Sequence, residues 1–92
     1  MSKTVYIVKC FYENMGDYYN EEYFHEVFST KEKAVQSFYE QIAKAKDEIV
    51  ENFEIDKSEI VSSETELEDS ISFQAEYDEV LYYIQLLTKE IK

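Results

Sequence analysis

Residues 30–53, TKEKAVQSFYEQIAKAKDEIVENF, decide the fold of this chain. Apolar residues recur in this stretch at spacings of three and four, which predicts one amphipathic helix from Thr30 to about Phe53. We expect a capping box at its start, in which Ser29 accepts a backbone N–H and Glu32 reaches back. At about 1.5 Å per residue the helix is roughly 36 Å long, enough to cross a small sheet. The stripe expected to face the core is Ala34, Val35, Phe38, Ile42, Ala45, Ile49 and Phe53.

Two predicted strands precede the helix. Residues Thr4 to Glu13, TVYIVKCFYE, are β-branched and aromatic and are apolar on both faces, which favours a central strand. The segment NMGDYYN follows and carries the only glycine, Gly16, so we expect a turn of several residues. The returning strand is Glu21 to Phe28, EEYFHEVF.

Two further strands are predicted after the helix. In the first, Ser70 to Glu76, apolar residues alternate with polar ones, so this strand should be half-buried. The last, Val80 to Thr88, is apolar on both faces. Tyr77, Asp78 and Glu79 form the predicted turn between them. A helix from Asp78 to Lys92 is the main alternative, but the run Tyr-Tyr-Ile inside this segment favours a strand.

The order of these elements predicts an α+β fold of type ββαββ. One long helix should pack on one face of a four-stranded antiparallel sheet whose central strands are the first and the last. With 92 residues the chain forms a single domain, residues 1–92. Between helix and third strand, Glu54 to Asp69 reads as an acidic connector containing one short helical turn capped by Asp56 and Glu59. Ile60 and Val61 are expected to pack against the core.

One helix covers one face of such a sheet, so the other face should present aromatic side chains to solvent or to a partner. Tyrosine suits an interface because it offers a large contact area and a polar tip at low entropic cost. Ordinary cross-strand aromatic packing is the competing explanation. The residues expected on the open face are Tyr6, Tyr12, Tyr23 and either Tyr82 or Tyr83.

Composition narrows the class of partner. The net charge is −12 and all nine basic residues are lysines. This balance argues against direct binding to nucleic acid, which needs a basic surface, and against binding to an anionic membrane. The plainest interpretation is an acidic protein kept soluble by its charge. The sequence contains no run of about 18 apolar residues, so no membrane span is predicted. The apolar stretch before Lys9 is too short for a signal peptide. The single cysteine, Cys10, is typical of a protein in a reducing cytoplasm.

No pattern in the sequence predicts catalysis, a metal site or a cofactor. The one histidine, His25, and the one cysteine, Cys10, have no metal-ligand spacing, and a glycine-rich phosphate loop is excluded by the single glycine. The two residues fall on strands that should pair, but no third residue is indicated to orient them. We expect a buried structural Cys10 and a surface His25, and no enzymatic activity.

Negative charge is concentrated in residues 46–69, KDEIVENFEIDKSEIVSSETELED. This stretch holds ten acids and two lysines, or −8 of the net −12. Part of it occupies the C-terminal turns of the helix, where the helix dipole disfavours acids by about 0.3–1 kcal/mol each. Asp47 and Glu51 also repel as like charges four residues apart. Residues that lower stability without a packing benefit are candidates for function.

A short, acidic, tyrosine-rich αβ chain with no cysteine pair resembles the small inhibitors that phages and mobile elements encode against host defence nucleases. Anti-CRISPR proteins that mimic DNA are the best-known group. The segment VYIVKCFYE, followed by EVFSTKEKA, also resembles the opening of small uncharacterised proteins of Gram-positive bacteria and their phages, which implies a similar fold and no known activity. Neither resemblance carries a diagnostic motif or assigns a binding residue.

We therefore expect a non-enzymatic, cytoplasmic inhibitor that binds the basic groove of a nucleic-acid-binding protein, for example a CRISPR effector nuclease, and blocks access of DNA or RNA. The alternative is a protein–protein interaction module that uses the open tyrosine face, as a homodimer or as an immunity-type partner of a basic protein. The residues expected to bind the partner are Asp47, Glu48, Glu51, Glu54, Asp56, Glu59, Tyr18 and Tyr19.

Overall fold

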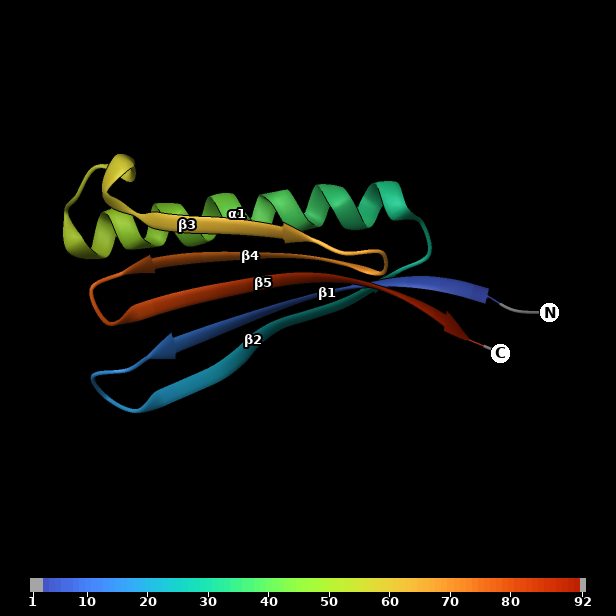
Figure 1. Ribbon diagram of the computed structural model, residues 1–92, viewed down its shortest axis with the longest axis horizontal. Coiled ribbons are helices and arrows are strands. Elements are labelled where there is room, and N and C mark those ends of the chain that lie inside the picture. The colour runs from blue at the N-terminus through green and yellow to red at the C-terminus, as the bar shows by residue number, and fades with distance from the viewer. Residues whose placement is uncertain (1–2, 92) are drawn as a thin grey trace.

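The computed structural model describes residues 3–91, which form one helix and one five-stranded antiparallel sheet (Figure 1). The α+β class with a single long helix on an antiparallel sheet is confirmed, but the predicted count of four strands is wrong. The sheet order is β2-β1-β5-β4-β3. The elements are β1 (Lys3–Asn14), β2 (Tyr19–Phe28), α1 (Lys31–Phe53), the 3₁₀ helix η1 (Lys57–Glu59), β3 (Val61–Glu66), β4 (Ser70–Tyr77) and β5 (Val80–Ile91).

The additional strand is β3, which lies inside the stretch predicted as a connector. It pairs with β4 from Val61 opposite Glu76 to Glu66 opposite Ile71 and forms one edge of the sheet. All six of its residues are exposed, so hydrophobic burial does not mark it as a strand. The expectation that Val61 packs against the core is wrong because its side chain is 70% exposed, whereas Ile60 does pack there.

The first and last strands lie inside the sheet, as predicted, with β5 at its centre. They pair along their whole lengths, from Lys3 opposite Ile91 to Asn14 opposite Val80. Residues 80–91 are strand throughout, so the alternative of a C-terminal helix is wrong for this range, and Lys92 lies outside the described residues.

The face of the sheet under α1 holds the main core. Val8 and Cys10 of β1 and Ile84 and Leu86 of β5 are almost fully buried there. They pack against an apolar stripe of α1 that agrees with the predicted one, except that Val35 and Phe53 are half-buried at its margins. The fully packed members of that stripe are Ala34, Phe38, Ile42, Ala45 and Ile49.

The predicted assignment to the open face is wrong for Tyr6, Tyr12 and Tyr23, and of the two alternatives Tyr82 and Tyr83 the structure selects Tyr83. Side chains alternate along a strand, and Val8 and Ile84 face α1, so Tyr6, Tyr12 and Tyr82 face it too. A β-bulge opposite Cys10 and Phe11 leaves Tyr23 as the extra residue of β2. Its ring lies 6.0 Å from that of Tyr82 on the covered side, which leaves Tyr83 on the open face.

The residues that cap the two ends of α1 are not those that the sequence pattern favours. Its N-cap is Thr30, whose hydroxyl accepts the backbone N–H of Lys33 at 3.4 Å, so the predicted capping role of Ser29 is wrong. At the other end Glu54 adopts a left-handed conformation with φ 52° and donates its backbone N–H to Val50. Glycine is the usual residue in that conformation because other side chains are strained there.

Candidate functional site

Three segments that are distant in sequence meet at one end of the molecule. Asn14 pairs with both Tyr19 and Val80, and Tyr77 pairs with Val80, so the β1–β2 and β4–β5 turns lie side by side. The backbone N–H of Met15 donates to the carbonyl of Glu79 at 2.8 Å and joins the two turns. Figure 1 shows the C-terminal end of α1 and η1 at this same end, opposite the start of β1 and the end of β5.

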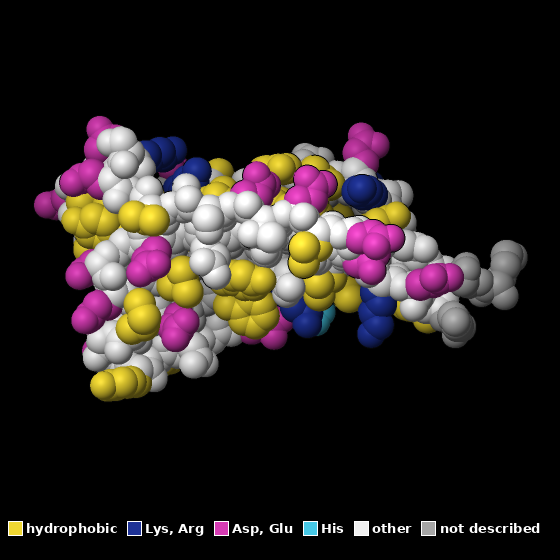
Figure 2. All heavy atoms as spheres, viewed as in Figure 1, with side chains coloured by type: hydrophobic (Ala, Val, Ile, Leu, Met, Phe, Trp, Pro, Cys, Tyr) yellow, Lys and Arg dark blue, Asp and Glu magenta, His cyan; other side chains and the backbone are white. Residues whose placement is uncertain are grey.

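This end carries almost all of the net charge of the protein. Residues 13–21, 47–59 and 76–79 contain twelve of the 21 acids and one of the nine lysines, or −11 of the net −12. Figure 2 shows acidic side chains gathered around this end of the molecule. We call these three segments the acidic pole.

Half of the predicted binding acids have a structural role at the pole. The Asp47 carboxylate lies 3.0 Å from the Lys57 ammonium group. Asp56 accepts the backbone N–H of Ser58 at 3.1 Å, and Glu59 accepts that of Asp56 at 3.0 Å, which forms the capping box predicted from the sequence. These bonds hold the chain in place as it leaves α1 and turns toward β3.

The other predicted acids lie along the last turns of α1. Glu51 and Glu54 are exposed, and no basic residue lies in the last turn to offset the helix dipole. Glu48 is exposed as well, but it lines a cavity together with Tyr82 of the sheet. Burial, and then the charge of Glu48, raise the pKa of the Tyr82 hydroxyl far above its usual value. These acids are all exposed, and Glu48 differs from Glu51 and Glu54 in that it borders the tyrosines of the sheet.

The two predicted tyrosines of the β1–β2 turn also differ. Tyr18 is 95% exposed and has a left-handed backbone conformation with φ 54°, which is strained for an aromatic residue. Tyr19 donates its hydroxyl to Glu21 at 2.8 Å, and its ring lies 6.1 Å from that of Tyr12. Tyr18 therefore projects from the pole, whereas Tyr19 is partly engaged in its structure.

The second half of the acidic stretch leaves the pole. It follows β3 to the opposite end of the sheet, where Glu66 pairs with Ile71. Glu64 on this strand accepts the Tyr39 hydroxyl at 3.3 Å. The contiguous run of acids in the sequence is thus not one surface, because β3 carries its later members away.

Sequence reasoning missed the acids that the two turns contribute. Glu13, Asp17, Asp78 and Glu79 belong to the pole but lie far from residues 46–69 in the sequence. The available signal was their position at predicted strand ends, since the ends of two antiparallel hairpins can meet at one edge of a sheet. Grouping these acids from the sequence requires knowledge of the strand order, because only the pairing of β1 with β5 brings the two turns together.

The single cysteine and single histidine do not form a site. Cys10 is fully buried under α1, and burial raises its pKa to about 11, an effect that the nearby Tyr23 hydroxyl partly offsets. His25 pairs with Lys9, one position along β1, so it lies on the other face, where its Nδ1 is 2.9 Å from Glu22. Within residues 3–91, no three His, Cys, Asp or Glu side chains are grouped as metal ligands.

Comparison with known proteins adds no identification. The chain matches no protein-family model, and no curated protein or solved structure is similar enough to be matched. In the part of the chain that the structure describes, no helix has both the length and the apolar character to cross a membrane.

Proposed function

We propose that this protein is a non-enzymatic inhibitor that binds, through its acidic pole, the basic groove of a nucleic-acid-binding protein and excludes DNA or RNA from it. The concentration of −11 of the net −12 in three segments at one end carries this proposal. Such a charge distribution creates a strong local field, which speeds encounter with a basic partner and makes binding sensitive to salt.

The shape of the molecule supports insertion of the pole into a groove. The pole is one end of a molecule about 50 Å long, with shorter dimensions of 25 and 19 Å. At the end of α1, the backbone positions of Glu51 and of the C-cap Glu54 are about 4.5 Å apart along the helix axis, a rise of the same order as the 3.4 Å between phosphates along one DNA strand. This axial density of negative charge supports the proposed mimicry of nucleic acid.

Tyr18 is the aromatic residue best placed to contact the partner. Its exposed ring and its left-handed backbone both disfavour the folded state without adding to the core. Aromatic residues at the centre of an interface frequently dominate the binding energy. We place Tyr18 at the contact, together with Glu51, Glu54 and the acids of the two turns.

The class of target that we propose is a host defence nuclease, such as a CRISPR effector. We choose this class because the composition and architecture of the chain resemble those of small phage-encoded inhibitors. These nucleases hold nucleic acid in positively charged channels, to which an acidic pole is complementary.

The test combines capture with competition. The protein is immobilised, host lysate is applied at low and at high salt, and each captured protein is purified and assayed for binding of a labelled oligonucleotide. The expected result is a captured nucleic-acid-binding protein that loses its oligonucleotide when the inhibitor is added. Raising the salt from 50 to 500 mM should weaken capture at least tenfold, because the contacts are electrostatic.

A matched pair of variants locates the effect. Glu51→Lys with Glu54→Lys changes the pole, whereas Glu66→Lys with Glu68→Lys makes the same change in net charge away from it. The first pair should abolish inhibition and the second should leave it nearly unchanged. If the pole variant inhibits like the wild type, or if the captured protein has no affinity for nucleic acid, the proposal is wrong.

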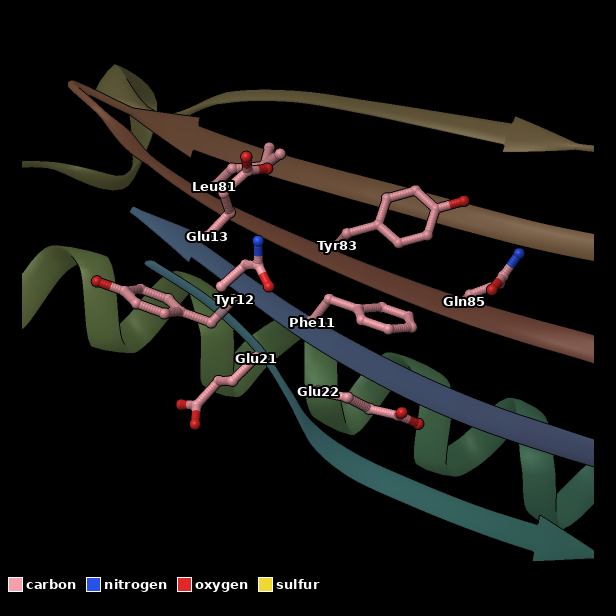
Figure 3. Close-up of a pocket in the computed structure, with 9 residues that line it drawn as sticks. Phe11, Tyr12, Glu13, Glu21, Glu22, Leu81, Tyr83 and Gln85 are labelled. Carbon is pink, nitrogen blue, oxygen red and sulfur yellow. The ribbon is translucent and has the colours of Figure 1, made fainter. Parts of the chain in front are cut away.

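A second candidate function uses the open face of the sheet. Phe11 and Tyr83 stand there with ring centroids 6.0 Å apart, and with Leu81 they line a shallow hollow of about 760 Å³. Figure 3 shows these side chains on the side of the sheet away from α1. A homodimer, or a complex with another protein, could bury this surface.

Light scattering distinguishes this second candidate. If the open face forms a homodimer, the mass in solution should be twice the 11.0 kDa of one chain and insensitive to salt. Tyr83→Lys should then give a monomer, and Tyr39→Lys on the exposed side of α1 should not. A monomer at 1 mM protein would exclude the homodimer.

A further inference from the structure

A second cavity lies between α1 and the β1–β2 hairpin, and it shares Tyr12 and Glu21 with the open-face hollow. It has a volume of about 300 Å³, at the lower end of the range of ligand pockets. Glu21, Glu48 and Asn52 of its lining belong to the acidic pole. Its lining consists of three tyrosines, two carboxylates and one amide, from Tyr12, Glu21, Tyr23, Glu48, Asn52 and Tyr82.

The fold brings these six residues together by three local features. Tyr12 and Tyr82 are paired in the register of β1 with β5, and their ring centroids are 5.1 Å apart. The β-bulge adds Tyr23 on the same side, with its ring nearly perpendicular to that of Tyr82. Glu48 and Asn52 are four residues apart on α1 and so lie on one helix face above these rings.

The two carboxylates of the cavity are exposed at its rim and are not neutralised. Glu21 accepts the Tyr19 hydroxyl at 2.8 Å, and the charge of Glu48 acts on the Tyr82 hydroxyl, whose pKa it helps to raise. Among residues 3–91, neither carboxylate forms an ion pair with a lysine. The cavity therefore combines aromatic walls with two negative charges whose cationic partner is absent from the described part of the chain.

Aromatic rings and carboxylates together favour one ligand chemistry. Tyrosine rings attract cations through their negative faces, and the attraction grows when the cation is removed from water. Carboxylates add charge-assisted hydrogen bonds. The two carboxylates would repel an anion. A neutral apolar group would leave both carboxylates without a cationic partner. A planar guanidinium suits the site better than an ammonium, because it stacks on rings and donates to two carboxylates at once.

We propose that this cavity binds a guanidinium group, the side chain of an arginine that a partner protein inserts between Glu21 and Glu48 against the three tyrosines. The source of the arginine rests on the proposed function, since a groove that binds nucleic acid is lined by basic side chains. The binding chemistry of the cavity is a property of this chain alone. It can therefore be tested without any partner.

The test is an NMR titration of the isolated, isotope-labelled protein. The probe is N-acetyl-arginine amide, and the control is N-acetyl-citrulline amide, which has nearly the same shape but no charge. We expect the arginine probe to shift the side-chain amide signals of Asn52 and the backbone signals around Tyr23 and Glu48, with a millimolar Kd. The citrulline probe should bind at least fivefold more weakly. Equal binding of the two probes, or shifts spread over the whole pole, would overturn the proposal.

Paired variants on adjacent helix positions locate the site. Glu48→Gln keeps the size of the side chain but removes one charge from the cavity, whereas Glu51→Gln removes one charge outside it. Asn52→Lys supplies an ammonium at the rim, and Glu51→Lys supplies one on the exposed side. The variants at 48 and 52 should each weaken arginine binding at least fivefold, and the two at 51 less than twofold. Equal effects of the inner and outer variants would show nonspecific attraction and overturn the assignment.

A third probe, spermidine, distinguishes two possible ligands of the cavity, an arginine side chain of a protein and a free polyamine. Spermidine carries ammonium groups and no guanidinium, and we expect it to bind this cavity no more tightly than the arginine probe. If spermidine binds tenfold more tightly, the ligand is a free polyamine and the arginine assignment is wrong. If the arginine probe binds as expected but no nucleic-acid-binding partner is captured, the cavity proposal stands and the proposed function fails.

Discussion

The ammonium group of Lys57 lies 3.0 Å from the carboxylate of Asp47 and ties η1 back to α1. Lys57 is the only lysine of the acidic pole, and this contact directs its charge toward a single acid. Within residues 3–91, Glu51, Glu54 and the acids of the two turns form no ion pair with a lysine. The one lysine of the pole therefore offsets the charge of Asp47 and leaves the other acids of the pole without a lysine partner among the described residues.

Removing this lysine should strengthen the field of the pole at little cost in stability. Lys57→Gln should lower the free energy of unfolding by less than about 1 kcal/mol, because the pair is exposed. The association rate with a basic partner at low salt should rise, as measured by stopped-flow fluorescence. Lys44→Gln makes the same charge change on an exposed part of α1 outside the pole. Equal acceleration by both variants would mean that net charge, and not the pole, steers association.

Glycine should have opposite effects at two neighbouring acids of α1. Glu54→Gly relieves a left-handed residue and should raise stability by about 1 kcal/mol, or several degrees in Tm. Glu51→Gly removes the same charge inside the helix and should lower stability by about 1 kcal/mol. Urea denaturation of both variants measures the difference. Stabilisation by both would show that like-charge repulsion outweighs backbone conformation.

Tyr18→Asn should increase stability and reduce binding. Asparagine tolerates the left-handed conformation better than tyrosine, so the free energy of unfolding should rise by up to about 1 kcal/mol. Loss of an aromatic interface residue should weaken partner binding at least tenfold, which corresponds to about 1.4 kcal/mol. Calorimetry measures both quantities. Unchanged affinity in this variant would remove Tyr18 from the contact.

Stability should decline at alkaline pH because of three groups on the covered face, the buried Cys10 and Tyr82 and the partly exposed Tyr23. Burial raises the pKa of Cys10 from 9.0 to about 11 and raises those of Tyr23 and Tyr82 well above 10. The unfolded chain then loses these protons first, so this stabilisation is complete below pH 9 and is lost as the pH rises toward the folded values. Urea midpoints from pH 8 to 11 measure the decline. Tyr82→Phe should make it shallower, and a midpoint constant to pH 11 would contradict the cause.

Most of the fold could be predicted from the sequence because local patterns determine it. The helix has a clear period, and β1 and β5 are apolar on both faces, which placed them correctly inside the sheet. That same two-sided pattern gave no indication of which face α1 covers, so Tyr6 and Tyr12 were assigned to the wrong face and the choice between Tyr82 and Tyr83 stayed open. The strand β3 was missed because Ser and Glu rarely form strands and only pairing with β4 stabilises it.

The candidate site could be predicted only in its helical part. The acids from Asp47 to Glu59 are contiguous in sequence, and the unfavourable helix dipole singled them out. The acids of the turns join them only through the strand order. The tyrosine cavity depends on the β-bulge at Tyr23, and a bulge follows from the register of two paired strands and not from the sequence of either.

The exposed strand β3 has a consequence for how copies of the protein meet. An edge strand offers unpaired backbone groups to any other strand that approaches it, and acids such as Glu64 and Glu66 discourage that approach by repulsion. Near the isoelectric point, about 4.3, the repulsion between whole molecules disappears. In colloidal terms, the carboxylates are the barrier that keeps an open sheet from extending from one molecule into the next.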